Sequence, residues 1–311
     1  MLERVVVVGA GAVGGAIGGL LAEAGVPVVL VARGEHGAAI RRDGLTLRMP
    51  ERSVVVAPPC VARVSEVAWR PGDLALVTTK LYDAAAAMDA LLAAAGPELP
   101  VVMGVNGIAG ERWAEERFSR VISMLVWLPA THLVPGEVRV HSGRARGVLD
   151  SGATSERATA QCSAWCERLS ATGFDALPRP DIVRWKRAKL IANLGGTAQA
   201  LVHDDWAAVV KAVRREGDAV LTAAGVDRVS ERELTARVAD VESRSVGGIA
   251  REGGSTWQSR ARGRPLETPW LEGEVARIAE RAGLDAPICR RLTEAAERGA
   301  TVSARAMLGP D

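Results

Sequence analysis

Three glycines near the start of the chain, Gly9, Gly11 and Gly14, have the G-x-G-x-x-G spacing of a turn that binds a dinucleotide pyrophosphate. In such a turn the first glycine permits a tight bend, the second lets the backbone approach the phosphates, and the third lets a helix pack closely on a strand. Ala12 and Val13 would open that helix and offer their N–H groups to the phosphates. The spacing therefore predicts a dinucleotide site.

Arg33 occupies a position where chains that bind NAD usually carry an Asp or Glu for the ribose 2′-hydroxyl. A guanidinium can hold a phosphate through two hydrogen bonds, and no carboxylate follows until Glu35. Arg33 therefore favours NADPH as the cofactor. A solvent-exposed arginine with no special role is the alternative.

Lys189 and Asn193 are spaced i,i+4, so they project from one face of a predicted helix, and Thr197 continues that face. A lysine that lies among apolar neighbours over a nicotinamide ring can have a lowered pKa and donate a proton to a carbonyl oxygen. Lys189 is thus a candidate general acid. The alternative is a surface lysine of an amphipathic helix.

A stretch rich in Gly, Ser and Arg, 253–274, brings two further polar residues, Ser255 and Glu267. We expect a loop that leads into a helix, with Glu267 or Thr268 as its cap and Pro269 in its first turn. For Glu267 the alternative to a functional role is that of a carboxylate at a helix start.

The candidate residues in the first half of the chain must be positioned by alternating strands and helices. The valines at 5–8 predict a buried strand, a helix follows to Gly25, and a second strand at 26–32 completes a β-α-β unit. This context disfavours a glycine-rich turn with a purely structural role. Further strands are expected at 44–47, 54–57, 73–80, 100–107 and 120–127, a hairpin at 138–143 and 146–152, and a short strand at 174–178. Helices are expected at 36–42, 83–95, 110–118 and 154–172.

Helical periods dominate the second half, at 181–201, 204–224, 231–248, 268–283 and 287–300. The pattern predicts two domains: residues 1–178 as an α/β Rossmann-type domain with a mostly parallel sheet, and residues 179–311 as an all-helical domain. A length of 311 residues fits two domains.

Polar residues end two of the predicted strands, Thr78–Lys80 and Asn106–Gly107. Ligands of open α/β sheets bind outside the carboxyl ends of the strands. We therefore expect Thr79, Lys80 and Asn106 to lie beside the cofactor, along the same sheet edge as the glycine turn.

Composition excludes several function classes. A net charge of +2 and the absence of a Lys/Arg cluster with aromatics argue against nucleic acid or an anionic membrane as partner. The start of the chain lacks a signal-peptide pattern, and no apolar run is long enough to span a membrane. The four cysteines are scattered, which favours buried thiols over a metal site. We expect a cytoplasmic protein without a metal.

The ordered set of motifs resembles the ketopantoate reductases, also called 2-dehydropantoate 2-reductases, over essentially the whole chain. It comprises GAGAVG at 9–14, Arg33, VTTK ending at Lys80, VNG with Asn106, KLIAN with Lys189 and Asn193, and GGSTWQS followed by Glu267. Each motif alone is modest, but their order is specific. The resemblance implies NADPH-dependent reduction of a 2-oxo acid, a place in pantothenate biosynthesis and, by analogy with relatives, a homodimer.

The same resemblance implies roles for individual residues. Lys189 would protonate the carbonyl oxygen as hydride arrives, and Glu267 would hold a substrate hydroxyl and position Lys189. Ser255 and Asn193 would bind the substrate. Asn106 would sit between nicotinamide and substrate, and Lys80 would lie near the cofactor ribose or the lysine.

The chain departs from the family pattern on the substrate side. Gly196 and Thr197 stand where a second Asn is common, Pro269 replaces an Asp, and Glu272 replaces an Asn. The reaction class is unaffected, but another 2-oxo acid becomes an alternative to 2-dehydropantoate. A β-hydroxyacid dehydrogenase or imine reductase, and a non-catalytic NADPH-binding protein, are further alternatives.

Overall fold

The computed structural model describes residues 2–143 and 146–309, which fold as two compact units. Unit 1 contains residues 1–105, 110–183 and 235–251, and unit 2 contains residues 106–109, 184–234 and 252–311. The sequence predicts the division at 178/179. In the structure 179–183 and 235–251 pack within the first unit, where Arg179 and Arg237 both form ion pairs with Asp150.

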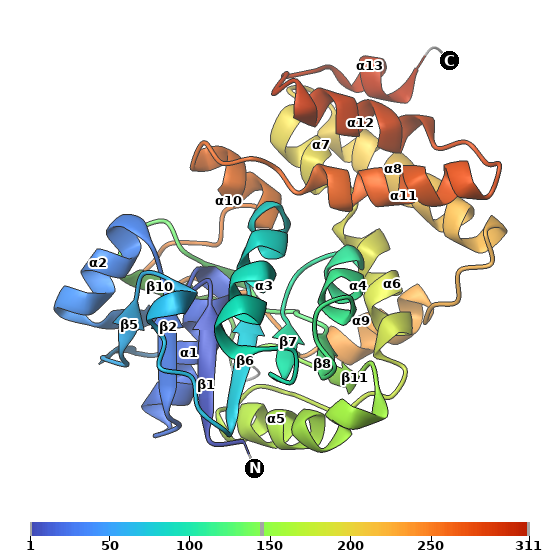
Figure 1. The fold of residues 1–311 in the computed structure, drawn as a ribbon. Coiled ribbons are helices and arrows are strands. Elements are labelled where there is room, and N and C mark those ends of the chain that lie inside the picture. The colour runs from blue at the N-terminus through green and yellow to red at the C-terminus, as the bar shows by residue number, and fades with distance from the viewer. Residues whose placement is uncertain (1, 144–145, 310–311) are drawn as a thin grey trace. The chain divides into compact units, whose positions relative to one another are not determined.

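A seven-stranded sheet is the centre of unit 1, with strand order β11-β8-β7-β6-β1-β2-β5 (Figure 1). Its strands are β1 (Arg4–Val8), β2 (Val28–Val31), β5 (Cys60–Val61), β6 (Asp73–Val77), β7 (Val101–Met103), β8 (Val121–Met124) and β11 (Ser151–Ala153). All neighbours are parallel except β11, which runs antiparallel to β8. The predicted Rossmann-type fold with a mostly parallel sheet is confirmed.

A smaller four-stranded sheet has the order β4-β3-β10-β9. Its strands are β3 (Leu45–Arg48), β4 (Ser53–Val56), β9 (Ala130–Thr131) and β10 (Glu137–Val140). The hairpin predicted from 138–143 and 146–152 is therefore wrong, because β10 pairs with β3 and β9 while β11 pairs with β8 in the larger sheet. The strand predicted at 174–178 is also wrong, since this segment forms only isolated bridges at Asp175 and Pro178.

The first helix, α1 (Ala12–Glu23), packs against both sheets. A Cβ added at Gly18 would lie 2.9 Å from a methyl of Leu30 in the larger sheet. A Cβ at Gly15 or Gly19 would lie 2.8 Å from Val138 or Leu47 of the smaller sheet. Glycines thus allow α1 to pack closely on both sheets.

The remaining helices of the first half are α2 (Gly34–Asp43), η1 (Val64–Glu66), α3 (Leu81–Ala95), α4 (Ala109–Glu115), η2 (Glu156–Ala158) and α5 (Thr159–Ala171). Those of the second half are α6 (Ile182–Asn193), α7 (Gly196–Leu201), α8 (Trp206–Ala223), α9 (Glu231–Val238), α10 (Ser255–Ala261), η3 (Thr268–Trp270), α11 (Glu272–Arg281), α12 (Pro287–Glu297) and α13 (Ala304–Leu308). Within the described part of the chain, no helix is both long and apolar enough to cross a membrane.

Unit 2 is helical, as predicted, around an apolar core that includes Leu190, Val213, Val275 and Leu292. The helix expected over 181–201 is divided into α6 and α7, because Gly195 adopts a left-handed conformation with φ of 95°. The helix expected over 231–248 ends at Val238. Residues Ser255–Ala261, expected in a loop, form α10.

Candidate functional site

The glycine turn has the conformation that a dinucleotide site requires. It follows the carboxyl end of β1, which lies between β2 and β6 where the chain order of the sheet reverses. Gly9 has φ of 98°, and a Cβ there would lie 2.8 Å from the backbone nitrogen of Thr79. A Cβ at Gly14 would overlap the carbonyl oxygen of Gly9 and the hydroxyl of Thr78. Only glycine fits these two positions.

The same turn leaves room where phosphates would lie. A Cβ at Gly11 would meet no atom within 4 Å, so the backbone is open there. Gly11 precedes α1 without a side-chain cap, and the first N–H groups of a helix, here from Ala12 and Val13, have no partner within it. The hydroxyl of Thr79, next to Gly9, is buried without a hydrogen-bond partner. These features of unit 1 fit a dinucleotide.

His36 supports the turn, and sequence reasoning missed it. Its Nδ1 accepts the N–H of Gly136 at 2.9 Å, so Nε2 carries the proton and donates to the carbonyl oxygen of Ala10 at 2.7 Å. Its ring also contacts that of His132, with a centroid distance of 3.9 Å. Because Gly136 and His132 lie about a hundred positions further along the chain, no local pattern could have indicated this arrangement.

Arg33 precedes α2 and is largely exposed, as a phosphate-binding residue would be. Its guanidinium forms an ion pair of 2.6 Å with Asp83, in the first turn of α3. This carboxylate partner was not predicted. Lys80, the residue before α3, lies after the carboxyl end of β6, as expected from the sequence.

Three of the predicted residues meet in unit 2. The side-chain oxygen of Asn106 accepts a hydrogen bond from the Lys189 ammonium at 2.9 Å and one from the Asn193 amide at 3.4 Å. Lys189 is only 7% exposed, so it is not the surface lysine that was the alternative. The i,i+4 spacing on α6 thus presents an ammonium and an amide to one oxygen.

Ser255 and Glu267 belong to the same unit, on segments that pack against α7. Ser255 begins α10, which approaches α7 so closely that a Cβ at Gly196 would lie 2.8 Å from the Thr256 hydroxyl. Glu267 is 4% exposed and directly precedes η3, without capping it through its side chain.

Two of the departures from the family pattern, Thr197 and Glu272, are fully buried. The hydroxyls of Thr197 and Thr268 form a hydrogen bond of 2.7 Å, and neither residue is exposed. Glu272 is also fully buried and accepts the N–H of Gly195 at 3.2 Å. Thr197 therefore bonds to a neighbouring element, and its hydroxyl does not line an open surface.

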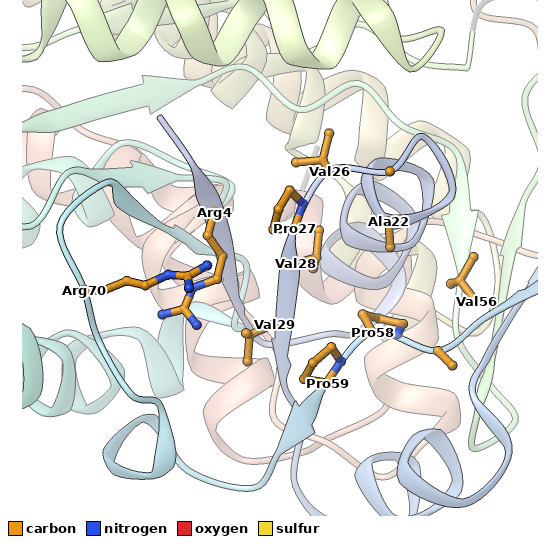
Figure 2. A pocket seen from close by; sticks show the side chains of 12 residues that line it. Arg4, Ala22, Val26, Pro27, Val28, Val29, Val56, Pro58, Pro59 and Arg70 are labelled. Carbon is orange, nitrogen blue, oxygen red and sulfur yellow. The ribbon is translucent and has the colours of Figure 1, made fainter. Parts of the chain in front are cut away.

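The predicted residues divide between the units. Those assigned to the cofactor, from Gly9 to Lys80, are in unit 1, whereas Asn106 and the residues assigned to substrate and catalysis are in unit 2. A pocket of about 520 Å³ in unit 1 is lined by none of them. Figure 2 shows it beside Arg4, Pro27 and Pro58, at the amino ends of β1 and β2, which is the sheet edge opposite the glycine turn.

The chain is similar to known proteins over most of its length. Residues 5–153 match the family model "Ketopantoate reductase PanE/ApbA", and residues 188–299 match its C-terminal model. The chain is 29% identical to a 2-dehydropantoate 2-reductase of Halobacterium salinarum over an alignment of 312 positions, which covers 94% of this chain and 97% of that protein.

Two solved structures are similar over nearly the whole chain. A PanE/ApbA family ketopantoate reductase from Ralstonia eutropha JMP134 has a TM-score of 0.77 at 26% identity, covering 95% of this chain and 97% of the other. D-mandelate dehydrogenase, solved with NADH and anilino(oxo)acetate, has a TM-score of 0.79 at 20% identity, covering 95% and 97%. The latter likeness concerns the fold alone.

Proposed function

The chain belongs to the ketopantoate reductase family, and from this we propose that it reduces a small branched 2-oxo acid with NADPH, most simply 2-dehydropantoate to pantoate. It is an oxidoreductase of the class that acts on CH–OH groups. The observation that carries the proposal is the buried ammonium of Lys189, held 2.9 Å from the side-chain oxygen of Asn106.

Reduction of a 2-oxo acid to a 2-hydroxy acid adds a hydride to the carbonyl carbon and a proton to its oxygen. The bound NADPH would supply the hydride. Lys189 would donate the proton from Nζ, because an ammonium stabilises negative charge as it develops on the oxygen. Asn106 accepts a hydrogen bond from that ammonium and so fixes its direction.

The other unit 2 residues would bind the substrate. Asn193 and Ser255 offer an amide and a hydroxyl to the carboxylate or hydroxyl of the acid, and Glu267 would accept a hydrogen bond from a substrate hydroxyl. In unit 1, Gly9, Gly11 and Gly14 with the start of α1 would hold the pyrophosphate, and Arg33 the 2′-phosphate.

A screen of NADPH consumption tests this proposal. 2-Dehydropantoate, other 2-oxo acids, 3-hydroxy acids with NADP⁺ and cyclic imines are assayed side by side, with NADH as the cofactor control. We expect 2-dehydropantoate to give the highest kcat/KM, and NADPH to exceed NADH. Turnover of an imine or a 3-hydroxy acid alone would overturn the proposal, as would tight NADPH binding without oxidation on any carbonyl.

One observation favours a second candidate, reduction of a 2-oxo acid that carries no hydroxyl. The Thr197 hydroxyl, at a position where the family commonly has an Asn, is bonded to Thr268 and fully buried. A substrate hydroxyl would thus find one polar partner fewer. The same screen distinguishes the two, since this candidate requires the highest kcat/KM on a simple branched or aromatic 2-oxo acid.

A further inference from the structure

Glu272 is a fully buried carboxyl group at the start of α11 in unit 2. Its Oε1 accepts the N–H of Gly195 at 3.2 Å, and its Oε2 has no hydrogen-bond partner. No Lys or Arg within the described part of unit 2 forms an ion pair with it. An ionised carboxylate in such a place would have hydrogen-bond donors but no cation beside it, which is costly for a buried charge.

Glu274, two residues further along α11, provides the contrast. It is 1% exposed, but it forms an ion pair of 2.7 Å with Arg277. One helix turn therefore holds two buried carboxyl groups in different environments. Glu274 has a cation beside it, and Glu272 has an amide N–H and an unpaired oxygen.

The groups around Glu272 favour its neutral form. Burial raises the pKa of Glu272. Hydrogen bonding from its own N–H, from the Gly195 N–H and from the hydroxyl and N–H of Thr197 opposes this only in part. The nearby titratable groups on packed elements are Cys289 of α12 and Glu216 of α8, and the latter bears a negative charge when ionised. α7 and η3 carry no ionisable side chain.

Gly195 lies in the turn that connects α6 to α7, and this turn begins directly after Asn193, the last residue of α6. Arg214 of α8 holds the carbonyl side of this turn, donating to the oxygens of Ala192 and Leu194 at 2.8 and 3.1 Å. Glu272 holds the N–H side. The turn is therefore fixed from both sides, two residues away from the amide that Asn193 directs to Asn106.

We propose that Glu272 is a positioning residue that acts as a neutral carboxylic acid, anchoring the Gly195 turn and thereby the substrate-binding amide of Asn193. The effect on substrate rests on the proposed function, whereas the protonation state of Glu272 does not. The test therefore has one arm that needs no substrate.

The first arm compares thermal unfolding of the wild type and Glu272→Gln between pH 5 and pH 9. In the unfolded chain the carboxyl ionises near pH 4.3. The fold must keep the proton on Glu272 above that pH, so wild-type stability falls as pH rises toward the raised folded pKa. In Glu272→Gln the side-chain oxygen still accepts the Gly195 N–H, and there is no carboxyl group that the fold must keep protonated. We expect Glu272→Gln to have a Tm about 3 °C above wild type at pH 8, and the difference to shrink toward pH 5.

Glu274→Gln is the matched control, because it removes a charge that Arg277 pairs. We expect Glu274→Gln to lower the Tm at pH 5 and at pH 8. An infrared difference spectrum adds a direct readout: the C=O band of a protonated carboxylic acid should be present at pH 7 and absent in Glu272→Gln. Parallel Tm curves for wild type and Glu272→Gln, or the absence of that band, would overturn the proposal.

The second arm measures kcat and KM on the substrate that the screen identifies. We expect Glu272→Ala, which removes the acceptor for Gly195, to lower kcat/KM about tenfold, chiefly through KM, the factor that one hydrogen bond is typically worth. Rescue by Glu272→Gln is expected, since its amide oxygen accepts the same N–H. Equal losses in both variants would refute the positioning role. If no substrate is turned over, the proposed function fails while the first arm still decides the state of Glu272.

Discussion

Lys189 is the residue on which the proposed chemistry depends. Its ammonium is buried and directed at Asn106, so it is placed to give a proton to an oxygen that becomes negative. We predict that Lys189→Ala lowers kcat by about 10²–10⁴-fold and leaves the Kd for NADPH unchanged, because the predicted cofactor turn belongs to the other unit. Steady-state kinetics and NADPH fluorescence titration measure the two quantities.

Lys186 is the matched control for this variant. It lies one turn earlier on the same helix and is similarly buried, at 4% exposure. Lys186→Ala is expected to change the Tm without a comparable loss of kcat. If both alanine variants lose turnover equally, the loss comes from removing a buried lysine from α6, and the acid role of Lys189 is refuted.

The ion pair between Arg33 and Asp83 leads to a second prediction at the residue scale. A charge-assisted hydrogen bond to phosphate is worth about 1.5–3 kcal/mol. We therefore expect Arg33→Ala to weaken NADPH binding at least about tenfold and to leave NADH binding nearly unchanged. Asp83→Asn, which frees the guanidinium, should not weaken NADPH. A similar loss for both cofactors would show that Arg33 does not bind the 2′-phosphate.

Spacing along the chain made part of the site predictable. Lys189 and Asn193 share a face because a helix places i and i+4 together, and the structure joins both to Asn106. Asp83 and His36 were missed as partners of Arg33 and Ala10, because those contacts join residues 50 and 26 positions apart. The roles of Lys189, Glu267 and Ser255 in catalysis and binding stay predictions.

At the scale of elements, α1 and the turn before it lead us to predict that glycine is required at one position for folding and at another for cofactor binding. A Cβ at Gly14 would overlap the Gly9 carbonyl and Thr78, so Gly14→Ala should destabilise unit 1 by about 1–3 kcal/mol.

A Cβ at Gly11 would have no atom within 4 Å, so Gly11→Ala should keep the wild-type Tm. It should nevertheless lose NADPH affinity, since the methyl group would occupy the space that we predict for the phosphates. Thermal unfolding and fluorescence titration separate the two effects. Unimpaired binding by Gly11→Ala would argue against a phosphate site at this turn.

Elements with a strong local pattern were predictable, and those set by distant packing were not. The run of valines in β1 and the run of alanines in α3 carry clear strand and helix signals in the local sequence. β10 was predicted to pair with the stretch after it, but it pairs with β3, which lies some ninety residues earlier. The break between α6 and α7 arises at Gly195, where a Cβ would lie 2.8 Å from Val210 of α8. The Gly195–Gly196 pair is a turn signal, but the helical period on both sides of it led to the prediction of one continuous helix.

At the scale of the whole molecule, the chain passes between the units several times, and the return segment 235–251 must be anchored in unit 1. Arg237 of α9 does this. It donates to both carboxylate oxygens of the fully buried Asp150, at 2.9 and 2.6 Å, and also pairs with Asp175. Arg179 and the N–H of Leu177 bind the same Asp150 carboxylate. This network joins three separate parts of the sequence within unit 1.

The network makes stability depend on acid in a defined way. Burial alone would raise the pKa of Asp150, but hydrogen bonds from Arg237 and Arg179 outweigh it and hold the pKa below its ordinary value. A carboxyl with a lowered folded pKa stabilises the fold above its unfolded pKa, about 3.9, and this contribution is lost as pH falls through the folded value. Breaking a buried pair costs about 3–5 kcal/mol, so Asp150→Asn should lower the Tm by several degrees at pH 7. The Tm difference between wild type and Asp150→Asn should stay constant above about pH 5 and become smaller below about pH 4.

Asp175→Asn, whose carboxylate is 45% exposed, is the control and should lower the free energy of unfolding by about 1 kcal/mol or less. If the Tm difference between wild type and Asp150→Asn is as large at pH 3 as at pH 7, Asp150 stabilises the fold through packing and not through its charge.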